Sequence, residues 1–460
     1  MNLHRLLLRR AAEDKPLRVA LIGAGKFGSM FLSQVRRTPG VHVTAVADLD
    51  PVRARASLTR VGWPPQQYEA RSADEALRTG ATWVTDDALG TIAHPAIEIV
   101  IDATGNPGAG IRHALECCTH GKHIVMVNVE ADALVGPLLA RRAAQAGVVY
   151  SLAYGDQPAL ICEMVDWART AGFEVVAAGK GTKYLPSYHG STPDTVWGHY
   201  GFSAERVANG DFNAQMFNSF LDGTKSAIEM AAVANATGLA AGPDGLAFPP
   251  CGVDALASVM KPRAEGGVLH QRGQVEVVSS LERDGVPVFR DLRWGVYVTF
   301  AADGEYVRRC FSEYGLVTDD SGDYAAMYKP YHLIGLELGI SVASVGLRRE
   351  ATGAPVDFQA DAVAVAKRDL KIGETLDGEG GYTVYGRLMR APDSLRMRAL
   401  PIGLAHRVHL TRSLKCGQTV TWSDIADPAT DAARVRREME QLFASCTLSP
   451  ATAETPALLK

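Results

Sequence analysis

Lysines occur in two polar stretches that each follow or adjoin apolar sequence. One is AAGKGTKYLPSYHG, residues 177–190, and the other is FLDGTKSAIEM, residues 220–230. When hydride reduces a carbonyl, the alkoxide that forms needs a proton, and a lysine within hydrogen-bond reach can supply it. Lysines also bind phosphate or carboxylate groups as point charges. Together with one aspartate, these stretches provide the candidate catalytic residues Lys180, Lys183, Asp222, Lys225 and Asp156.

Each of these candidates also has a purely structural interpretation. The alternation in EVVAAGKGTKY could leave both lysines of the first stretch on a solvated strand face. Lys225 is expected in the first turn of a helix, where its charge opposes the helix dipole, and Asp222 could cap that helix. Asp156 could hold a divalent ion, Mg²⁺ or Mn²⁺, together with Glu163, or it could cap a helix of its own.

Three glycines directly follow an apolar run near the N-terminus. In VALIGAGKFGSMF, a predicted strand leads through Gly23, Gly25 and Gly28 into a predicted helix. In this context a GxGxxG motif binds a dinucleotide, because the glycines permit a tight turn, close approach of the pyrophosphate and close helix packing. The helix N-terminus, at Lys26 and Phe27, would offer its free N–H groups to the phosphates.

A carboxylate follows at the distance typical of ribose recognition. The strand VHVTAVADLD carries Asp48 about 20 residues after the last glycine, where it would accept hydrogen bonds from the ribose hydroxyls. Arg53 and Arg55 could bind the 2′-phosphate of NADP, or they could be solvated residues of a helix. The sequence therefore leaves both NAD and NADP open as cofactor.

Further apolar strands alternate with helical runs over residues 81–157, which predicts a doubly wound parallel sheet resembling the Rossmann fold. Ligands of such sheets lie beyond the carboxyl ends of the strands. The residues that we expect there, facing the nicotinamide, are Thr104, Gly105, Asn106, Asn128, Tyr154 and Gly155. A simple turn before a helix is the alternative for residues 104–106.

Two hairpins are predicted in the second half. Each contains an Asp-Gly turn, one at Asp284 and Gly285 and the other at Asp303 and Gly304. They indicate an antiparallel sheet whose exposed face needs cover, so we expect a homodimer or higher homo-oligomer. Residues 327–347 are predicted to form a helix that returns to the nucleotide-binding part.

The order of these segments resembles homoserine dehydrogenases. The resemblance rests on the glycine turn, the strand that ends in Asn128, the run GPLLARRAAQAGVVYSLAYGDQPALI (residues 136–161) and the run FLDGTKSAIEMAAVANATGL (residues 220–239). It covers roughly residues 17–347. At the position where that family has a lysine after the asparagine, this chain has Val129 and Glu130.

The last third resembles an SAF domain, a β-clip module. Its two halves contain the related segments RDLKIGETL, residues 368–376, and RSLKCGQTV, residues 412–420. A homoserine-dehydrogenase-like body joined to an SAF domain resembles the reductoisomerase-like proteins that act on 1-deoxyxylulose 5-phosphate. The resemblance implies hydride transfer, with a divalent metal as a further requirement.

The predicted α/β fold therefore has several parts. They are a Rossmann domain with an N-terminal helix (1–155), an α+β substrate and dimerisation domain (156–350), an SAF domain (351–425), and a C-terminal helix with a loose tail (426–460).

Composition narrows the possible partners. The 460 residues carry a net charge of -4, which offers no basic footprint for nucleic acid. No apolar segment approaches the roughly 20 residues needed to cross a bilayer, and the N-terminus is too acidic for a secretion signal. The seven cysteines include no CxxC pair, so we expect a cytoplasmic protein.

The resulting hypothesis is an NAD(P)-dependent oxidoreductase acting on a small anionic polyol derivative. Two alternatives stay open: a sensor that binds nicotinamide nucleotide without turnover, and a lyase or epimerase with tightly bound NAD.

Overall fold

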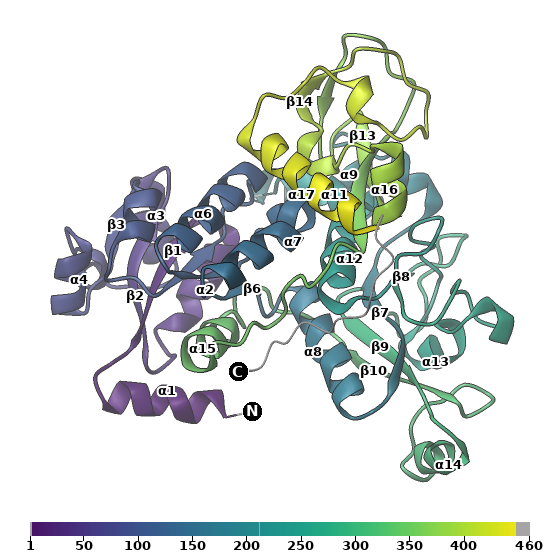
Figure 1. Cartoon of the computed structure of the whole chain (residues 1–460), viewed down its shortest axis with the longest axis horizontal. Helices are drawn as coiled ribbons and strands as arrows, with labels where there is room; N and C mark the ends of the chain where they lie inside the picture. The colour runs from purple at the N-terminus through teal and green to yellow at the C-terminus, as the bar shows by residue number, and fades with distance from the viewer. Residues whose placement is uncertain (1, 211, 448–460) are drawn as a thin grey trace.

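The computed structural model describes residues 2–210 and 212–447 (Figure 1). Its N-terminal part is built on six parallel strands: β1 (Leu17–Ile22), β2 (Val41–Ala47), β3 (Trp83–Thr85), β4 (Ile99–Asp102), β5 (His123–Met126) and β6 (Tyr150–Leu152). They are ordered β3-β2-β1-β4-β5-β6, the doubly wound order whose switch point lies between β1 and β4. The predicted fold class is confirmed.

Helices cover both faces of this sheet, which explains why its strands are almost continuously apolar. The helices of the N-terminal part are α1 (Leu3–Ala12), α2 (Lys26–Val35), α3 (Pro51–Arg60), α4 (Ala73–Thr79), α5 (Ala88–Ala93), α6 (Pro107–Thr119) and α7 (Val129–Gln145). Alternate strand residues enter two cores: one packs against α5, α6 and α7, the other against α2 and α3.

A helix from much later in the chain completes the second of these cores. Helix α15 (Gly339–Arg348) packs beside α1 and contacts β1, β4, β5 and β6 (Figure 1). The predicted return of the chain is thus confirmed, but the helix is shorter than predicted. Residues 327–329 belong instead to a strand, β10 (Tyr324–Lys329).

The second sheet has the order β10-β9-β7-β8. Its other strands are β7 (Glu174–Thr182), β8 (Gln274–Ser279) and β9 (Val296–Ala301). The first predicted hairpin forms only as a short turn at Asp284 and Gly285, with an antiparallel bridge between Leu281 and Pro287. The predicted pairing of β8 with β9 is wrong, because β7 lies between them, parallel to β8 and antiparallel to β9. The second predicted hairpin is also wrong, since helix α14 (Glu305–Glu313) follows Asp303 and Gly304.

One helix lies at the centre of the molecule. Helix α12 (Thr224–Thr237) contacts α7, the second sheet, and α8 (Gln157–Thr170), and it also packs on two C-terminal strands, β11 (Ala360–Ala366) and β13 (Val384–Arg390). Nearly all of its residues are therefore buried. Gly386 makes the close contact possible, because an added Cβ would lie 3.0 Å from the Thr224 side chain.

The C-terminal region contains two small antiparallel sheets, β11 with β13 and β12 (Thr375–Asp377) with β14 (His406–His409). Its assignment to an SAF domain stays a prediction. The remaining helices are α9 (Val196–Tyr200), α10 (Ala204–Asn209), α11 (Ala214–Leu221), α13 (Leu256–Val259), α16 (Ala391–Met397) and α17 (Asp431–Thr447). No helix within the described ranges is both long and apolar enough to cross a membrane. The loose tail predicted for the C-terminus lies outside the described residues.

Candidate active site

The glycine loop after β1 has the geometry of a phosphate cradle. Gly23 has a φ of +96°, and an added Cβ would lie 2.7 Å from the carbonyl oxygen of Ala103. An added Cβ on Gly28 would lie 2.2 Å from the carbonyl oxygen of Gly23. At Gly25, by contrast, an added Cβ would meet no heavy atom within 4 Å. The first and third glycines therefore shape the loop, and the second leaves bare backbone open to a ligand, which fits the diphosphate of a dinucleotide.

Asp48 lies at the end of β2 and already has internal partners. Its Oδ2 accepts a hydrogen bond of 2.8 Å from the Ala24 N–H, and its Oδ1 accepts one of 2.8 Å from the Arg53 guanidinium. Asp48 thus fixes the glycine loop to β2, while the Arg53 side chain remains 62% exposed. Arg55 points elsewhere and donates to the carbonyl oxygen of Tyr68.

The carboxyl ends of β4 and β5 are joined by a side-chain network. The Asn128 amide donates to the carbonyl oxygen of Asn106 at 2.8 Å and to the Thr104 hydroxyl at 3.2 Å. Thr104 in turn donates to Asp102, whose second carboxylate oxygen pairs with His113. The network therefore holds the loop expected to face the nicotinamide.

Gly105 and Asn106 lie exposed on that loop, as do Gly25 and Lys26 on the glycine loop, whereas Asn128 is buried. Sequence reasoning missed Asp102 and His113. The available signal was a carboxylate at the end of an otherwise apolar strand.

Tyr154 follows β6 and faces a second group of residues. Its hydroxyl donates to Glu163 and accepts a hydrogen bond of 3.2 Å from the Lys329 ammonium. Burial and the Glu163 carboxylate raise the pKa of Tyr154 above its ordinary value. Gly155, with a φ of +93°, lets the chain 333–337 approach, because an added Cβ would lie 2.8 Å from the carbonyl oxygen of Leu333.

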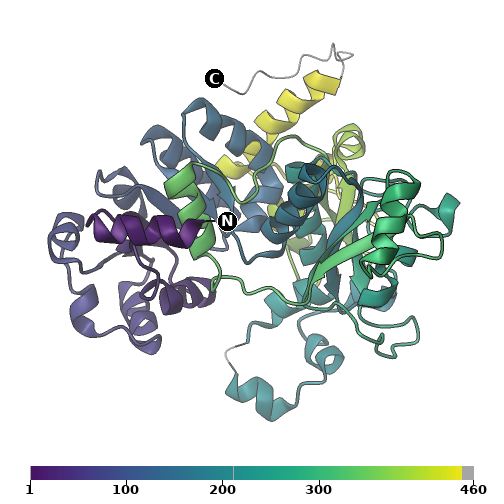
Figure 2. The ribbon, with the colours of Figure 1, turned by 90° about the horizontal axis from the view of Figure 1, so that it is seen from below.

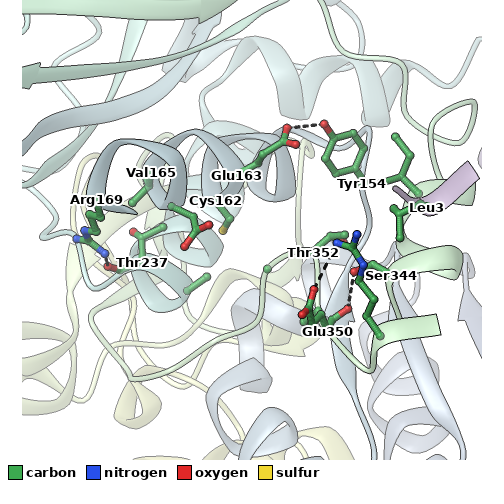
Figure 3. A pocket seen from close by; sticks show the side chains of 16 residues that line it. Leu3, Tyr154, Cys162, Glu163, Val165, Arg169, Thr237, Ser344, Glu350 and Thr352 are labelled. Atoms are coloured by element: carbon green, nitrogen blue, oxygen red, sulfur yellow. Dashed lines mark hydrogen bonds and ion pairs between the residues drawn. The ribbon is translucent and has the colours of Figure 1, made fainter. Parts of the chain in front are cut away.

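Figure 3 shows this Tyr154–Glu163 contact at one side of a cavity of about 340 Å³ between α8 and α15. The cavity is also lined by Arg169, which donates to the carbonyl oxygen of Thr237, and by Glu350. None of the predicted catalytic residues lines it.

Beyond the ends of β5 and β6, two lysines lie among carboxylates. The Lys180 ammonium donates to Glu229 and, at 2.9 Å, to Gln157, and both ionic side chains are only 3% exposed. The Lys225 ammonium pairs with Glu130, with side chains 16% and 14% exposed. We refer to these residues and their two acidic neighbours as the lysine–carboxylate cluster: Lys180, Lys225, Glu130, Asp156, Glu229 and Glu379.

Two carboxyl groups of the cluster have pKa values that are raised to near neutral pH. Burial, then the Glu229 carboxylate, raises the pKa of Asp156 to about 7, against the opposing effect of Lys225. Burial, then Glu130, raises the pKa of Glu379 to about 7. Four neighbouring carboxylates, led by Glu130, outweigh burial and raise the pKa of Lys225 above its ordinary value. Lys225 is therefore an ammonium ion beside groups that can hold a proton at neutral pH.

The structure separates the predicted catalytic residues into three sets. Lys180, Lys225 and Asp156 come together in the cluster. Asp222 accepts a hydrogen bond from the Thr224 N–H and forms a buried ion pair of 2.7 Å with Lys367 of the C-terminal region. Lys183 lies apart and donates to the carbonyl oxygen of His199.

Sequence reasoning missed the acidic partners Glu130, Glu229 and Glu379, and also Lys367. Only Glu130 could have been noticed in the sequence, because Val129 and Glu130 follow Asn128 where homoserine dehydrogenases have a lysine.

The proposed divalent ion finds no support in the donor arrangement. Asp156 accepts from the Gln157 N–H and Glu163 is occupied by Tyr154. Within residues 2–210 and 212–447, no group of three or more His, Cys, Asp or Glu side chains is arranged to hold a metal ion.

Two family profiles match separate parts of the chain. Residues 17–127 match the family described as "Oxidoreductase family, NAD-binding Rossmann fold", and residues 155–338 match "Oxidoreductase DRL, catalytic domain". The chain is thus an NAD(P)-dependent oxidoreductase whose second matched region contains most of the lysine–carboxylate cluster. A comparison with curated proteins found no match.

Solved structures with similar arrangements share little sequence. A probable dehydrogenase from Thermotoga maritima is 13% identical, with 73% of this chain and 90% of that chain covered and a TM-score of 0.35. The 1-deoxy-D-xylulose 5-phosphate reductoisomerase of Zymomonas mobilis, solved with NADPH, is 15% identical, with 47% and 56% covered and a TM-score of 0.31. The myo-inositol dehydrogenase from Lactobacillus casei is 16% identical, with 40% of this chain and 52% of that chain covered and a TM-score of 0.28. Such TM-scores add no argument about activity.

Proposed function

We propose that this NAD(P)-dependent oxidoreductase transfers hydride between the nucleotide and a carbonyl or hydroxyl group of a small anionic polyol derivative, a sugar phosphate or a sugar acid. One observation carries the proposal: the lysine–carboxylate cluster begins where the nucleotide-binding sheet ends. Glu130 lies two residues after Asn128, which holds the loop 104–106, and Asp156 lies two residues after Tyr154. Residues of α12 and β7, with Glu379 of the C-terminal region, complete the cluster.

The chain's own residues supply the proton chemistry. The bound nucleotide supplies hydride; the protein must supply or accept the proton on the substrate oxygen. Lys225 is the proton donor in this proposal, because it is charged and its side chain is the more exposed of the two cluster lysines. Asp156 and Glu379, each with a pKa raised to about 7 by burial, can return a proton to Lys225. Lys180 is a positioning residue, since it is buried against Glu229.

Among possible substrates we propose 1-deoxy-D-xylulose 5-phosphate first. Support comes from the match of residues 155–338 to the DRL catalytic domain and from the sequence resemblance to reductoisomerase-like proteins. We propose NADP as the preferred nucleotide, because Arg53 neutralises Asp48 and remains exposed at the ribose position. We further propose that the protein is a homodimer and that it is located in the cytoplasm.

The test follows NADPH oxidation with 1-deoxy-D-xylulose 5-phosphate and with a panel of sugar phosphates and sugar acids. Lys225→Met is expected to lower kcat by about 10²- to 10⁴-fold, the usual contribution of general acid catalysis, with nucleotide affinity retained. Lys371→Met, an exposed lysine of the C-terminal region, serves as the control. Full turnover by Lys225→Met would contradict the assigned role. Nucleotide that stays bound without net turnover of any substrate would favour the lyase, epimerase or sensor alternatives.

A further inference from the structure

Two half-buried cations near the lysine–carboxylate cluster have no carboxylate partner. Within the described residues, neither Lys183 nor Arg293 forms a salt bridge, and the Arg293 guanidinium makes no hydrogen bond. The Lys183 ammonium donates only to a neutral acceptor, the carbonyl oxygen of His199, at 2.5 Å. Three buried basic side chains are paired with carboxylates, Lys180 with Glu229, Lys367 with Asp222 and Arg436 with Asp361. Lys122 is buried without one, but it donates to two carbonyl oxygens, those of His94 and Ile97.

The backbone brings these two cations together. Lys183 directly follows β7, and Arg293 lies in the turn before β9, which pairs with β7. Gly181 allows this turn to lie directly on β7: its N–H donates to the carbonyl oxygen of Gly295 at 3.0 Å, and an added Cβ would lie 2.0 Å from the carbonyl oxygen of Leu292. The close approach depends on the absence of a side chain at Gly181.

Both cations lie near the same aromatic ring. The Lys183 ammonium and the Arg293 guanidinium carbon are each 5.7 Å from the centroid of the Tyr200 ring. Tyr200 ends α9, in the segment that projects from the body of the molecule in Figure 2. Burial, and next the Arg293 charge, lower the pKa of Lys183, as expected for two like charges near the same ring. Like charges held together without a counter-ion favour an anionic ligand.

The position fits the substrate of the proposed reaction. His189 is hydrogen-bonded to the carbonyl oxygen of Asp222 at 2.7 Å, and Asp222 stands three residues before Lys225. The segment 183–200 therefore packs at the start of α12. Both lysines of the lysine–carboxylate cluster already pair with carboxylates, so an anionic group of the substrate is better accommodated at a separate cationic place.

We propose that Lys183 and Arg293 form the subsite that binds a phosphate monoester group of the substrate, and this assignment rests on the proposed function. A guanidinium fork can bind two phosphate oxygens, an ammonium can bind a third as a point charge, and the Tyr200 ring forms one wall. Lys183 is accordingly a binding residue, although the sequence suggested a catalytic role.

The experiment measures binding of inorganic phosphate to the full chain by its effect on thermal unfolding, with acetate as the carboxylate probe. Phosphate should stabilise the wild-type protein by mass action. Lys183→Met and Arg293→Met should each weaken phosphate binding by about ten- to hundredfold, the usual effect of one charge-assisted hydrogen bond. Arg290→Met is the matched control, because Arg290 lies three residues before Arg293 in the same loop but is paired with Asp254 at 3.1 Å.

Without ligand, both variants should unfold at the wild-type temperature or above it, because each removes one of two repelling charges. Equal phosphate binding by the wild type and both variants, no binding by the wild type, or acetate binding as tight as phosphate binding would each overturn the proposal. If a methionine variant unfolds early, Arg293→Lys decides, because it keeps the charge and removes the fork: its phosphate affinity should be lower than that of the wild type, and an unchanged affinity would overturn the proposal.

Nicotinamide nucleotide binding, measured on the same proteins, separates the two proposals. Wild-type protein that binds phosphate through Lys183 and Arg293 but binds no nucleotide would refute the proposed function and leave the anion subsite intact.

Discussion

The buried ion pair between Lys180 and Glu229 should respond differently to loss of one partner and loss of both. Each side chain is 3% exposed, so Lys180→Met leaves the Glu229 charge without its ammonium partner in a nearly dry environment. Breaking such a pair costs about 3–5 kcal/mol of unfolding free energy, whereas replacing both partners by apolar residues is close to neutral. We therefore expect Lys180→Met to be clearly less stable than the double variant Lys180→Met/Glu229→Leu.

Denaturant unfolding followed by circular dichroism gives the four free energies of this double-mutant cycle. Arg434→Met is the surface control, since its ion pair with Asp431 is 65% and 91% exposed and should contribute at most about 1 kcal/mol. Additive losses in the two single variants, or a cost of Lys180→Met no larger than that of the control, would refute the assignment of a buried, mutually compensating pair at the site.

Three further predictions concern pH, cofactor choice and packing. Burial raises the pKa of Asp132 from 3.8 to about 7, so between these pH values the folded protein keeps a proton that the unfolded chain loses. Relative to Asp132→Asn, the stability of the wild type should therefore fall by up to about 4 kcal/mol from pH 4 to pH 8. A stability difference between the two proteins that stays the same at all pH values would contradict this. Arg53→Ala should weaken NADP binding by about tenfold and leave NAD binding unchanged, because one charge-assisted hydrogen bond to the 2′-phosphate is lost. Calorimetric titration with both nucleotides checks this, and equal losses of NADP and NAD affinity would place Arg53 away from the 2′-phosphate. Gly181→Ala should cost about 1–3 kcal/mol, since its Cβ would lie 2.0 Å from the carbonyl oxygen of Leu292, and an unchanged unfolding midpoint would contradict that contact.

The parallel sheet could be predicted because the sequence signal of each of its strands is local. Each strand is a short apolar run next to a helical pattern, and the turn at Gly23 follows a buried strand, so order and type of the first six strands agree with the structure. The two predicted hairpins failed for different reasons, although the Asp-Gly sequences at Asp284 and Asp303 are real turn signals. Strand β7, about 100 residues earlier in the chain than β8, lies between β8 and β9 and separates them. After Gly304 the chain forms helix α14 instead of a second strand.

The candidate site shows the same division. Lysines could be recognised by type, but their partners lie far away in sequence: Lys225 pairs with a residue 95 positions earlier, and Lys180 with one 49 positions later. Nothing local to Lys183 predicts that it lies near the same Tyr200 ring as Arg293. Likewise, Gly223 and not Asp222 is the N-cap residue of α12; Asp222 accepts a hydrogen bond from the Thr224 N–H, and its buried partner Lys367 comes from the C-terminal region.

The most direct test of the account is nucleotide binding by Gly25→Val. Gly25 has a φ of −68°, and an added Cβ would meet no heavy atom within 4 Å, so the valine should leave the unfolding midpoint unchanged. If the open backbone at Gly25 binds the diphosphate, calorimetric titration with NADPH should show tight binding by the wild type and a loss of at least about hundredfold in the variant, equal to about 2.7 kcal/mol. Wild-type affinity in a stably folded Gly25→Val protein would contradict the account.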